Sequence, residues 1–318
     1  MNNICIFGAA GFIGTNLSLE LTKDSNNCLK VVDKKKEYFS NYKSILNKNI
    51  KIIEDNLDAD TNFDEILGGQ DIVYHLVSSN SPTTSNMDFY NEIMPNINFS
   101  IKLFDSCIKN KIKKVIFISS GGTIYGKDAI CPINEDCITN PITTYGLQKE
   151  MIEKLLYIYN YKYGLCYKVI RLANPYGSYQ RPNGQLGVIT SFVYNSLKKG
   201  EINVYGEGSV VRDFIYIDDA IKGIINIANS NANTSIYNLG SGHGTSINEV
   251  ISILQKCLKQ EIKVNYQLAR KVDVPVNYLD IRRYESEFGK FHTISIEEGI
   301  QKMINFMKDN LFKKEIKS

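Results

Sequence analysis

A tyrosine and a lysine four residues apart, Tyr145 and Lys149, are the pair in this sequence best suited to proton transfer. On a helix, side chains at positions i and i+4 lie on one face, so the phenol and the ammonium would point the same way. A free tyrosine titrates near pH ~10, and a neighbouring positive charge favours the phenolate. The spacing therefore predicts that Lys149 lowers the pKa of Tyr145, so that the phenol can act as a base near neutral pH.

A glycine-rich turn near the start of the chain is typical of a phosphate-binding site. The apolar run 4–7 predicts a buried strand before the turn, and a helix-like pattern follows it. Gly8 permits the tight turn, Gly11 lets the backbone approach a pyrophosphate, and Gly14 allows close packing of helix on strand. The helix N-terminus then offers free N–H groups to the phosphates. The cofactor contacts expected here are Gly8, Gly11, Phe12, Ile13 and Gly14.

The acid at the end of the second predicted strand favours NAD over NADP. Asp33 lies 19 residues after Gly14, close to the ~20 expected for a carboxylate on the adenosine ribose. Such a carboxylate repels a 2′-phosphate. The three lysines at 34–36 could neutralise that phosphate, although a lysine run at a strand end is usually a solvated loop. We therefore expect NAD, and tighter binding of NADPH than of NADH would contradict this.

The elements that must position these motifs alternate between short apolar runs and longer helix-like segments. Strand-like runs occupy residues 71–77, 114–119 and 168–172, and helix-like segments occupy 91–110 and 145–163. This alternation predicts an α/β fold, a Rossmann-type doubly wound parallel sheet. The pattern loosens after Asn174. We expect an NAD-binding domain over 1–173 and a smaller C-terminal substrate-binding α/β lobe over 174–318, with some segments returning to the first domain.

Composition excludes several classes of function. The net charge of +3 and the dispersed basic residues argue against a nucleic-acid partner. The seven cysteines form no CxxC pair and no metal-like cluster with the three histidines, which suggests a reducing compartment and no metal. No apolar stretch approaches the ~20 residues that span a membrane, and the first strand begins almost at Met1. We expect a soluble cytoplasmic protein.

Over nearly its whole length the chain resembles the extended short-chain dehydrogenase/reductases, and among them the NAD-dependent nucleotide-sugar epimerases and dehydratases. The motifs that carry the resemblance are Gly8-x-x-Gly11-x-x-Gly14, Asp33, SSGGTIYG at 119–126, Tyr145-x-x-x-Lys149, RLANPYG at 171–177, VRDFIYIDD at 211–219 and YNLGSG at 237–242. The resemblance implies epimerisation at C4 of a UDP-hexose. Tyr145 removes the proton of the C4 hydroxyl while hydride passes to the nicotinamide, and Lys149 holds the cofactor ribose. A transient 4-keto sugar then takes the hydride back on its other face.

The third catalytic residue of the family, a Ser or Thr that hydrogen-bonds the reacting oxygen, is missing at the matching position, Gly121. Thr123 lies two residues further along, where an extended segment returns its side chain to the same face. We expect Thr123 to replace the missing hydroxyl, with Ser120 as the second choice. Unchanged turnover in Thr123→Ala would contradict this role.

The resemblance also implies further contacts. Those expected for the cofactor are Asn56, Leu57, Leu76, Asn96 and Ser119, beside Tyr145 and Lys149. Those expected for the substrate are Thr123, Asn174, Gln185, Leu186, Tyr205, Arg212, Arg270 and Asp273. The two arginines would clamp the diphosphate, Asp273 would bind the substrate ribose, and Tyr205 would stack on the uracil. Asn174 and Asn96 are equally well read as satisfied buried amides, and Arg212 as an ion-pair partner of Asp213 or Asp218.

Three alternatives to a UDP-glucose/galactose epimerase remain open. Asn277 stands where strict epimerases of this kind tend to carry a bulky tyrosine, so N-acetylhexosamine substrates fit as well. An NAD(P)H-dependent 4-ketosugar reductase would use the same Tyr145 and Lys149. A sugar-nucleotide-sensing protein without activity is supported only by Gly121. A 4,6-dehydratase is disfavoured because Gly122 and Thr123 stand in place of its acidic pair.

The family further implies a homodimer built from the helices near 91–110 and 145–162.

Overall fold

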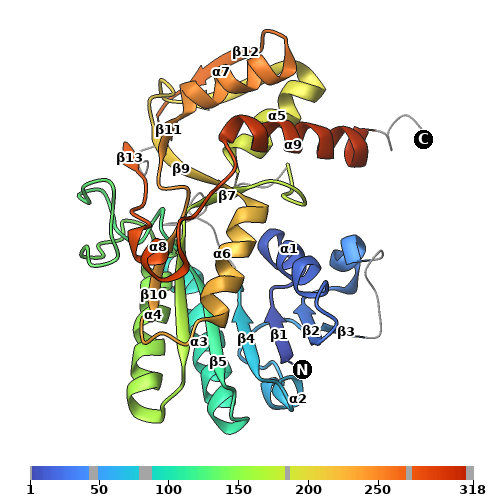
Figure 1. The fold of residues 1–318 in the computed structure, drawn as a ribbon, viewed down its shortest axis with the longest axis vertical. Helices are drawn as coiled ribbons and strands as arrows, with labels where there is room; N and C mark the ends of the chain where they lie inside the picture. Colours follow the sequence, from blue (N-terminus) through green and yellow to red (C-terminus); the bar gives the residue numbers. More distant parts are fainter. Residues whose placement is uncertain (1, 43–48, 79–87, 183–186, 270–273, 313–318) are drawn as a thin grey trace.

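Every strand of the larger sheet runs parallel to its neighbours, as the alternating pattern predicted. The structure, a computed structural model, describes residues 2–42, 49–78, 88–182, 187–269 and 274–312. Its seven-stranded sheet has the order β10-β6-β5-β4-β1-β2-β3 (Figure 1). The strands are β1 (Asn2–Phe7), β2 (Asn27–Asp33), β3 (Ile50–Glu54), β4 (Ile72–His75), β5 (Lys114–Ser120), β6 (Tyr167–Leu172) and β10 (Ile236–Leu239). The order reverses between β1 and β4, and ligands bind such sheets at the carboxyl ends of the strands beside this reversal.

Alternate residues of each strand enter two separate cores, one on each face of the sheet. Ile4 and Ile6 of β1 pack with α1 (Phe12–Leu21) and α6 (Ile217–Asn229), whereas Cys5 and Phe7 pack with helices on the other face. Those helices are α2 (Phe63–Leu67), α3 (Phe89–Lys109) and α4 (Thr144–Tyr163). Because side chains alternate along a strand, a strand covered on both faces is apolar throughout. The continuous apolar runs therefore predicted the layers correctly.

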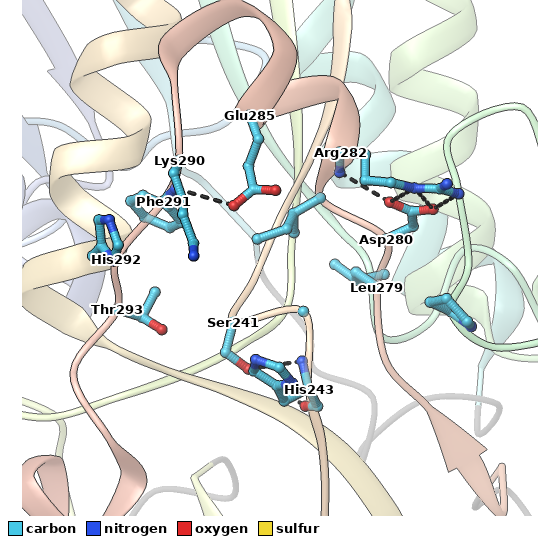
Figure 2. A pocket seen from close by; sticks show the side chains of 13 residues that line it. Ser241, His243, Leu279, Asp280, Arg282, Glu285, Lys290, Phe291, His292 and Thr293 are labelled. Carbon is cyan, nitrogen blue, oxygen red and sulfur yellow. Dashed lines mark hydrogen bonds and ion pairs between the residues drawn. The ribbon is translucent and has the colours of Figure 1, made fainter.

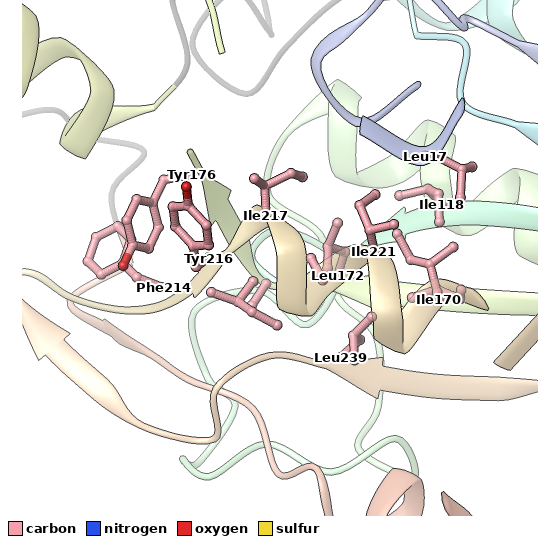
Figure 3. Packing of buried hydrophobic residues seen from close by; sticks show 14 of the residues in the cluster. Leu17, Ile118, Ile170, Leu172, Tyr176, Phe214, Tyr216, Ile217, Ile221 and Leu239 are labelled. Carbon is pink, nitrogen blue, oxygen red and sulfur yellow. The ribbon is translucent and has the colours of Figure 1, made fainter. Parts of the chain in front are cut away.

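The chain beyond residue 173 contributes to the large sheet as well as to the smaller lobe. Strand β10 pairs in parallel with β6. Helix α6 covers one face, and its Ile217 and Ile221 share a core with Leu17 of α1 and with Ile118 and Ile170 of the sheet (Figure 3). Two elements after residue 173, β10 and α6, therefore lie on the large sheet, while the division into domains at 1–173 and 174–318 stays a prediction.

The smaller lobe lies beyond the carboxyl ends of the large sheet (Figure 1). One small sheet has the order β11-β9-β13, with β7 also paired to β9, and a second joins β12 to β8. The strands are β7 (Asn174–Tyr176), β8 (Glu201–Tyr205), β9 (Val211–Tyr216), β11 (Gly244–Ser246), β12 (Lys263–Gln267) and β13 (Val276–Asn277). The helices of this lobe are α5 (Val188–Lys199), α7 (Ile247–Leu258) and α9 (Ile296–Met307), followed by the short segment η2 (Lys308–Phe312). Helix α8 (Arg282–Phe288) lies beside β10, and the short segment η1 (Lys36–Tyr42) lies beside α1 and β3.

Asp213 ties the smaller lobe to the end of the large sheet. Its buried carboxylate accepts hydrogen bonds from the backbone N–H groups of Ser241 at 2.8 Å and Leu279 at 3.2 Å. Burial raises the pKa of Asp213, and these hydrogen bonds oppose that rise. One side chain of β9 thus holds both the segment after β10 and the segment after β13.

Within the described ranges, none of the helices combines the length and the apolar character needed to cross a membrane.

Candidate active site

The glycine turn after β1 has the backbone that a bound pyrophosphate requires. Gly8 adopts φ +82°, a left-handed conformation that favours glycine. A Cβ added at Gly14 would lie 2.4 Å from the carbonyl oxygen of Gly8, so only glycine lets α1 start this close to the strand. No side chain caps the start of α1 at Gly11, which leaves the helix N-terminus to a ligand.

Residues from neighbouring strand ends complete the cofactor site. One carboxylate oxygen of Asp33 accepts a hydrogen bond from the N–H of Ala10 at 2.8 Å, which fixes this acid against the turn. The backbone of Leu76 lies beside Gly8, where an added Cβ would be 3.1 Å from the Leu76 carbonyl carbon. Asn56 and Leu57 follow the end of β3 at the same edge of the sheet. These residues fit NAD, because the turn has room for glycine only at Gly14 and the carboxylate of Asp33 is fixed beside the turn, where a ribose would bind.

Tyr145 and Lys149 lie one turn apart on α4, as their spacing predicted. Lys149 is buried, and its Nζ donates a hydrogen bond to the carbonyl oxygen of Ile118 in β5 at 2.9 Å. The ammonium also stands 5.6 Å from the ring centre of Tyr145 and 4.8 Å from that of Phe117. The start of α4 is fixed by Thr143, whose side chain accepts a hydrogen bond from the N–H of Gly146.

The predicted lowering of the Tyr145 pKa is wrong for the protein without its cofactor. Burial raises the pKa of Tyr145 to about 12. Burial also lowers the pKa of Lys149 to about 8, and the carboxylate of Glu153 opposes that change. Removing water from both groups disfavours the phenolate and the ammonium alike. The spacing correctly predicted that the two side chains lie close together. It could not predict their pKa values, because these depend on burial and therefore on tertiary structure.

The loop after β5 shows why position 121 carries glycine. A Cβ there would lie 2.6 Å from Cδ1 of Leu279 and 3.0 Å from the carbonyl oxygen of Arg171. Leu279, wholly buried, therefore fills the space that a serine or threonine side chain would need. Sequence reasoning missed this residue, because Leu279 lies far along the chain and outside every motif.

Thr123 and Ser120 form a pair of hydroxyls next to the start of α4. Thr123 Oγ1 donates to Ser120 Oγ at 2.8 Å, and both residues are partly exposed. A Cβ added at Gly146 would be 2.7 Å from the carbonyl oxygen of Thr123, so the residue after Tyr145 packs directly on Thr123. The structure thus places the Thr123 backbone against the first turn of α4, and the role of each hydroxyl stays a prediction.

Ser119 makes a structural contact that its motif did not predict, and Asn96 makes one that agrees with its alternative interpretation as a satisfied buried amide. Ser119 is buried, and its Oγ donates to a carboxylate oxygen of Glu153 at 2.5 Å. Asn96, buried on α3, donates through Nδ2 to the carbonyl oxygen of Glu92 at 3.0 Å. The expected cofactor contacts of Ser119 and Asn96 remain predictions. Glu153, four residues after Lys149, is a neighbour that the i, i+4 rule could have identified.

His75 lies in the core of the protein, among aromatic side chains. It is buried at the end of β4, and Nε2 shares a hydrogen bond of 2.9 Å with Ser100 Oγ. Its ring lies 5.1 Å from that of Phe117. Burial lowers the pKa of His75 to about 3, so its imidazole is neutral at physiological pH.

Several predicted substrate residues lie between the sheet and the smaller lobe. Asn174 donates through Nδ2 to the carbonyl oxygen of Asp213 at 2.9 Å, and its Oδ1 faces Gly122. Arg212 donates through Nη1 to the carbonyl oxygens of Val211 and Val274. Gln185, Leu186, Arg270 and Asp273 lie outside the described residues.

Asn277 and Tyr205 occupy very different surroundings. Asn277 is 2% exposed, and its Nδ2 donates to the carbonyl oxygen of Gly121, in the loop after β5, at 3.4 Å. Tyr205 ends β8 with its ring 46% exposed, and the following residue, Gly206, lies beside Ala269. Tyr205 is thus accessible to a flat ligand, while Asn277 is part of the wall behind Gly121.

A separate cavity of about 490 Å³ lies beside α8 and the segment 290–293 (Figure 2). Arg282 and Lys290 bring two positive charges to it, and Asp280 and Glu285 bring two negative charges. Asp280 is paired with Arg282, and Glu285 accepts a hydrogen bond from the N–H of Phe291. The balanced charge gives this cavity no electrostatic preference for a phosphate, and Tyr145 and Lys149 are not among its lining residues.

The fold and the site together define the class of protein. A parallel sheet with a glycine turn, a ribose-binding acid and a Tyr–Lys pair beside it is typical of NAD-binding dehydrogenases and reductases. Residues 4–240 match the NAD dependent epimerase/dehydratase family, and the chain belongs to this family of enzymes, whose cofactor is NAD.

Curated relatives span different reactions. A putative UDP-glucose 4-epimerase of Methanocaldococcus jannaschii is 31% identical over 312 residues, which cover 96% of this chain and 99% of the relative. A dTDP-4-dehydro-6-deoxyglucose reductase of Escherichia coli is 29% identical, with 95% and 96% of the two chains covered.

Solved structures share the whole fold. The UDP-glucose 4-epimerase of Thermotoga maritima with UDP-glucose has a TM-score of 0.89 at 31% identity and covers 97% of this chain and 99% of its own. The UDP-N-acetylglucosamine 4-epimerase of Methanobrevibacter ruminantium, with UDP-N-acetylmuramic acid, has a TM-score of 0.90 at 30% identity over 98% and 99%. The UDP-glucuronic acid 4-epimerase of Bacillus cereus, with UDP-glucuronic acid and NAD, has a TM-score of 0.89 at 26% identity over 96% and 99%.

Proposed function

We propose that this enzyme epimerises C4 of a UDP-hexose through a transient 4-keto sugar. The observation that carries the proposal is the Tyr145–Lys149 pair on α4, where the next residue, Gly146, packs on the Thr123 backbone in a loop whose residues 121–123 include no carboxylate. Elimination of water needs an acid and a base in that loop, whereas epimerisation needs only a reversible proton acceptor and the cofactor.

Each residue of the pair has a distinct part in this reaction. NAD, when bound, supplies the hydride acceptor and a cationic nicotinamide ring. Tyr145 accepts the proton of the C4 hydroxyl and later returns it to the keto oxygen. Lys149, as an ammonium, contacts the cofactor ribose and favours the phenolate. Thr123, in the loop beside α4, would turn its hydroxyl to donate a hydrogen bond to the reacting oxygen, and Ser120 would then donate to Thr123.

The substrate side is assigned to residues of the smaller lobe. Arg212 and Arg270 would bind the diphosphate, because guanidinium groups bind phosphate oxygens in a bidentate fashion. The UDP-sugars in the related structures support a UDP-sugar substrate, whose uracil would stack on Tyr205 and whose ribose would bind Asp273. Asn174, Gln185 and Leu186 would surround the sugar.

Asn277 favours an enzyme that also accepts N-acetylhexosamines. It lies against the Gly121 carbonyl, at the wall of the catalytic loop, and an amide there occupies less volume than a tyrosine. We expect Asn277→Tyr to reduce turnover of UDP-N-acetylhexosamines more than that of UDP-glucose. Equal effects on the two substrates would contradict this assignment.

We propose a cytoplasmic homodimer formed through α3 and α4. Tyr157 and Tyr161 lie one turn apart on α4 and are 59% and 81% exposed, while Phe89 and Tyr90 at the start of α3 are 62% and 71% exposed. Large apolar side chains exposed at both ends of two packed helices are typical of a protein–protein interface.

A 4-ketosugar reductase is the second candidate, and the similarity to the Escherichia coli reductase favours it over the others. It would use the same Tyr145 and Lys149 but would consume NAD(P)H with every turnover. An epimerase regenerates its NAD and needs no reductant.

The test is to incubate the NAD-loaded protein with UDP-glucose, UDP-galactose and their N-acetyl forms, without reductant, and to identify the products by NMR. The proposal predicts a mixture of C4 epimers from at least one of these substrates. A 4-ketosugar substrate consumed only with stoichiometric NAD(P)H, and no epimer from any UDP-hexose, would favour the reductase.

A further inference from the structure

A buried ion pair lies directly beneath the Tyr145–Lys149 turn of α4. Glu153 is one helical turn beyond Lys149, on the same face, and is 4% exposed. Its carboxylate accepts hydrogen bonds from Arg171 of β6, with the shortest at 2.8 Å, and from Ser119 of β5. Three neighbouring elements of the first domain thus meet at one carboxylate.

The arginine of this pair is itself held in place. Arg171 Nη1 donates to the hydroxyl of Tyr125 at 3.0 Å and to the carbonyl oxygen of Glu135 at 3.1 Å. The hydroxyl of Tyr125 donates to Asn238 Oδ1 at 2.6 Å, in β10. The guanidinium also lies 5.0 Å from the ring centre of Tyr125. These contacts fix Arg171, and Arg171 fixes Glu153.

Stability alone does not account for such a pair. The cost of removing two charges from water often exceeds their attraction, and apolar residues of similar volume are frequently as stable or more so. What distinguishes Glu153 is its neighbour. Lys149 binds the carbonyl oxygen of Ile118, the residue before Ser119, so the ammonium and the carboxylate hold adjacent residues of β5.

The charged and titratable groups around Lys149 come from three elements. Tyr145 and Glu153 lie on α4, His75 lies on β4, and Arg171 lies on β6 behind Glu153. His75 is neutral, and the Tyr145 phenol is neutral before the cofactor binds. Glu153 is therefore the group whose negative charge favours the ammonium, against the effect of burial.

We propose that Glu153 is a positioning residue, which Ser119 and Arg171 hold rigidly so that its carboxylate keeps Lys149 charged and in place for the cofactor. The inference rests on the proposed role of Lys149. It adds Glu153, with Ser119 and Arg171 behind it, as the residues that support that role. It requires the charge of Glu153, not only its shape. Glu153→Gln keeps the shape and the ability to accept hydrogen bonds, and it removes the charge.

The test measures NAD affinity by calorimetry between pH 6 and 10, because NAD binding reports on Lys149 without requiring sugar turnover. We expect Glu153→Gln to shift the alkaline loss of affinity to lower pH by about one unit. Arg171→Met removes the positive charge that opposes the ammonium of Lys149, and it should shift the alkaline loss of NAD affinity to higher pH. A structural role for the pair predicts the same direction for both variants, and that result, or no shift in either, would overturn the proposal.

Two controls separate this effect from misfolding and from a wrong function. In a Lys149→Arg background the guanidinium does not titrate in this range, so adding Glu153→Gln should leave the pH profile unchanged; a shift there would overturn the proposal. The double variant Glu153→Gln/Arg171→Met has no unpaired buried charge, and its shift should be smaller than that of Glu153→Gln alone. Because only NAD binding is read, absence of epimerase activity would count against the proposed function and not against Glu153.

Discussion

The pairing of a phenol with an ammonium is decided at the residue scale. A spacing of four residues was enough to predict that Tyr145 and Lys149 share a face of one helix, and the structure confirms it. The spacing did not predict their pKa values, because those values depend on burial. Burial in turn depends on how α4 packs on β4 and β5. The resemblance to a family likewise showed that Gly121 lacks the usual Ser or Thr side chain. It did not show that the Leu279 side chain fills the space where that side chain would lie.

Lys149 lowers the stability of the empty protein, and this can be measured. Burial lowers its pKa to about 8, so below that pH the folded state holds an ammonium that would be better solvated in the unfolded chain. We expect Lys149→Met to raise the free energy of unfolding by up to about 3 kcal/mol at pH 6–7. The gain should shrink as the pH rises from 8 towards 10.5, because the folded wild type loses the lysine proton in this range while the unfolded chain still holds it.

Chemical denaturation of the cofactor-free protein at several pH values would check this difference. Lys154→Met, at an exposed position of the same helix, is the matched control and should change stability little. A Lys149→Met variant less stable than the wild type at pH 6–7 would contradict the account.

At the scale of single elements, the junction of β1 with α1 was predictable and the contacts behind β5 were not. The glycine spacing predicted a turn that tolerates no Cβ, and Gly14 bears this out. The hydrogen bonds of Ser119 and Arg171 to Glu153 join residues that are far apart in sequence, and no local pattern marks them. The motifs that contain Ser119 and Arg171 predicted a site, but not which of their side chains are structural.

Gly14→Ala should weaken NAD binding by roughly tenfold or more, which corresponds to about 1.4 kcal/mol. The added Cβ would meet the Gly8 carbonyl oxygen at 2.4 Å and the Ala9 Cα at 2.6 Å, so α1 must move away from the turn. Calorimetric titration with NAD measures the change.

Gly69→Ala is the control for this prediction. Gly69 has φ +73° and no atom within 4 Å of an added Cβ, so alanine there introduces backbone strain without a clash. Its NAD affinity should equal that of the wild type. Equal affinities in Gly14→Ala and the wild type would show that the turn does not need glycine at this position.

At the scale of the whole molecule, the sheet and its two cores could be predicted from the sequence, and the partition of the chain could not. Strand β10 returns to the large sheet through its pairing with β6, although 63 residues separate the end of one from the start of the other. A run as short as Ile236–Leu239 is too brief for its partner to be deduced from its own pattern.

The proposed dimer gives a prediction at this scale. Replacing Tyr157 and Tyr161 together by glutamate places two charges on the exposed face of α4, where a partner would have to bury them. We expect light scattering to give a dimer for the wild type and a 36.0 kDa monomer for the double variant.

Tyr266→Glu, at a residue that is 59% exposed on β12 of the smaller lobe, is the matched control and should leave the dimer intact. A wild-type monomer, or a dimer that survives both substitutions on α4, would place the interface elsewhere or exclude it.

The most direct test of the proposed chemistry is the turnover of Tyr145→Phe. The substitution removes one hydroxyl from a partly buried ring and leaves the glycine turn, Asp33 and Lys149 untouched, so the protein should fold and bind NAD normally. With NAD loading confirmed by absorbance, we expect C4 epimerisation to fall by ~10²–10⁴-fold, the usual contribution of a positioned acid–base group. Epimerisation at the wild-type rate in the folded, NAD-loaded variant would show that another group accepts the proton.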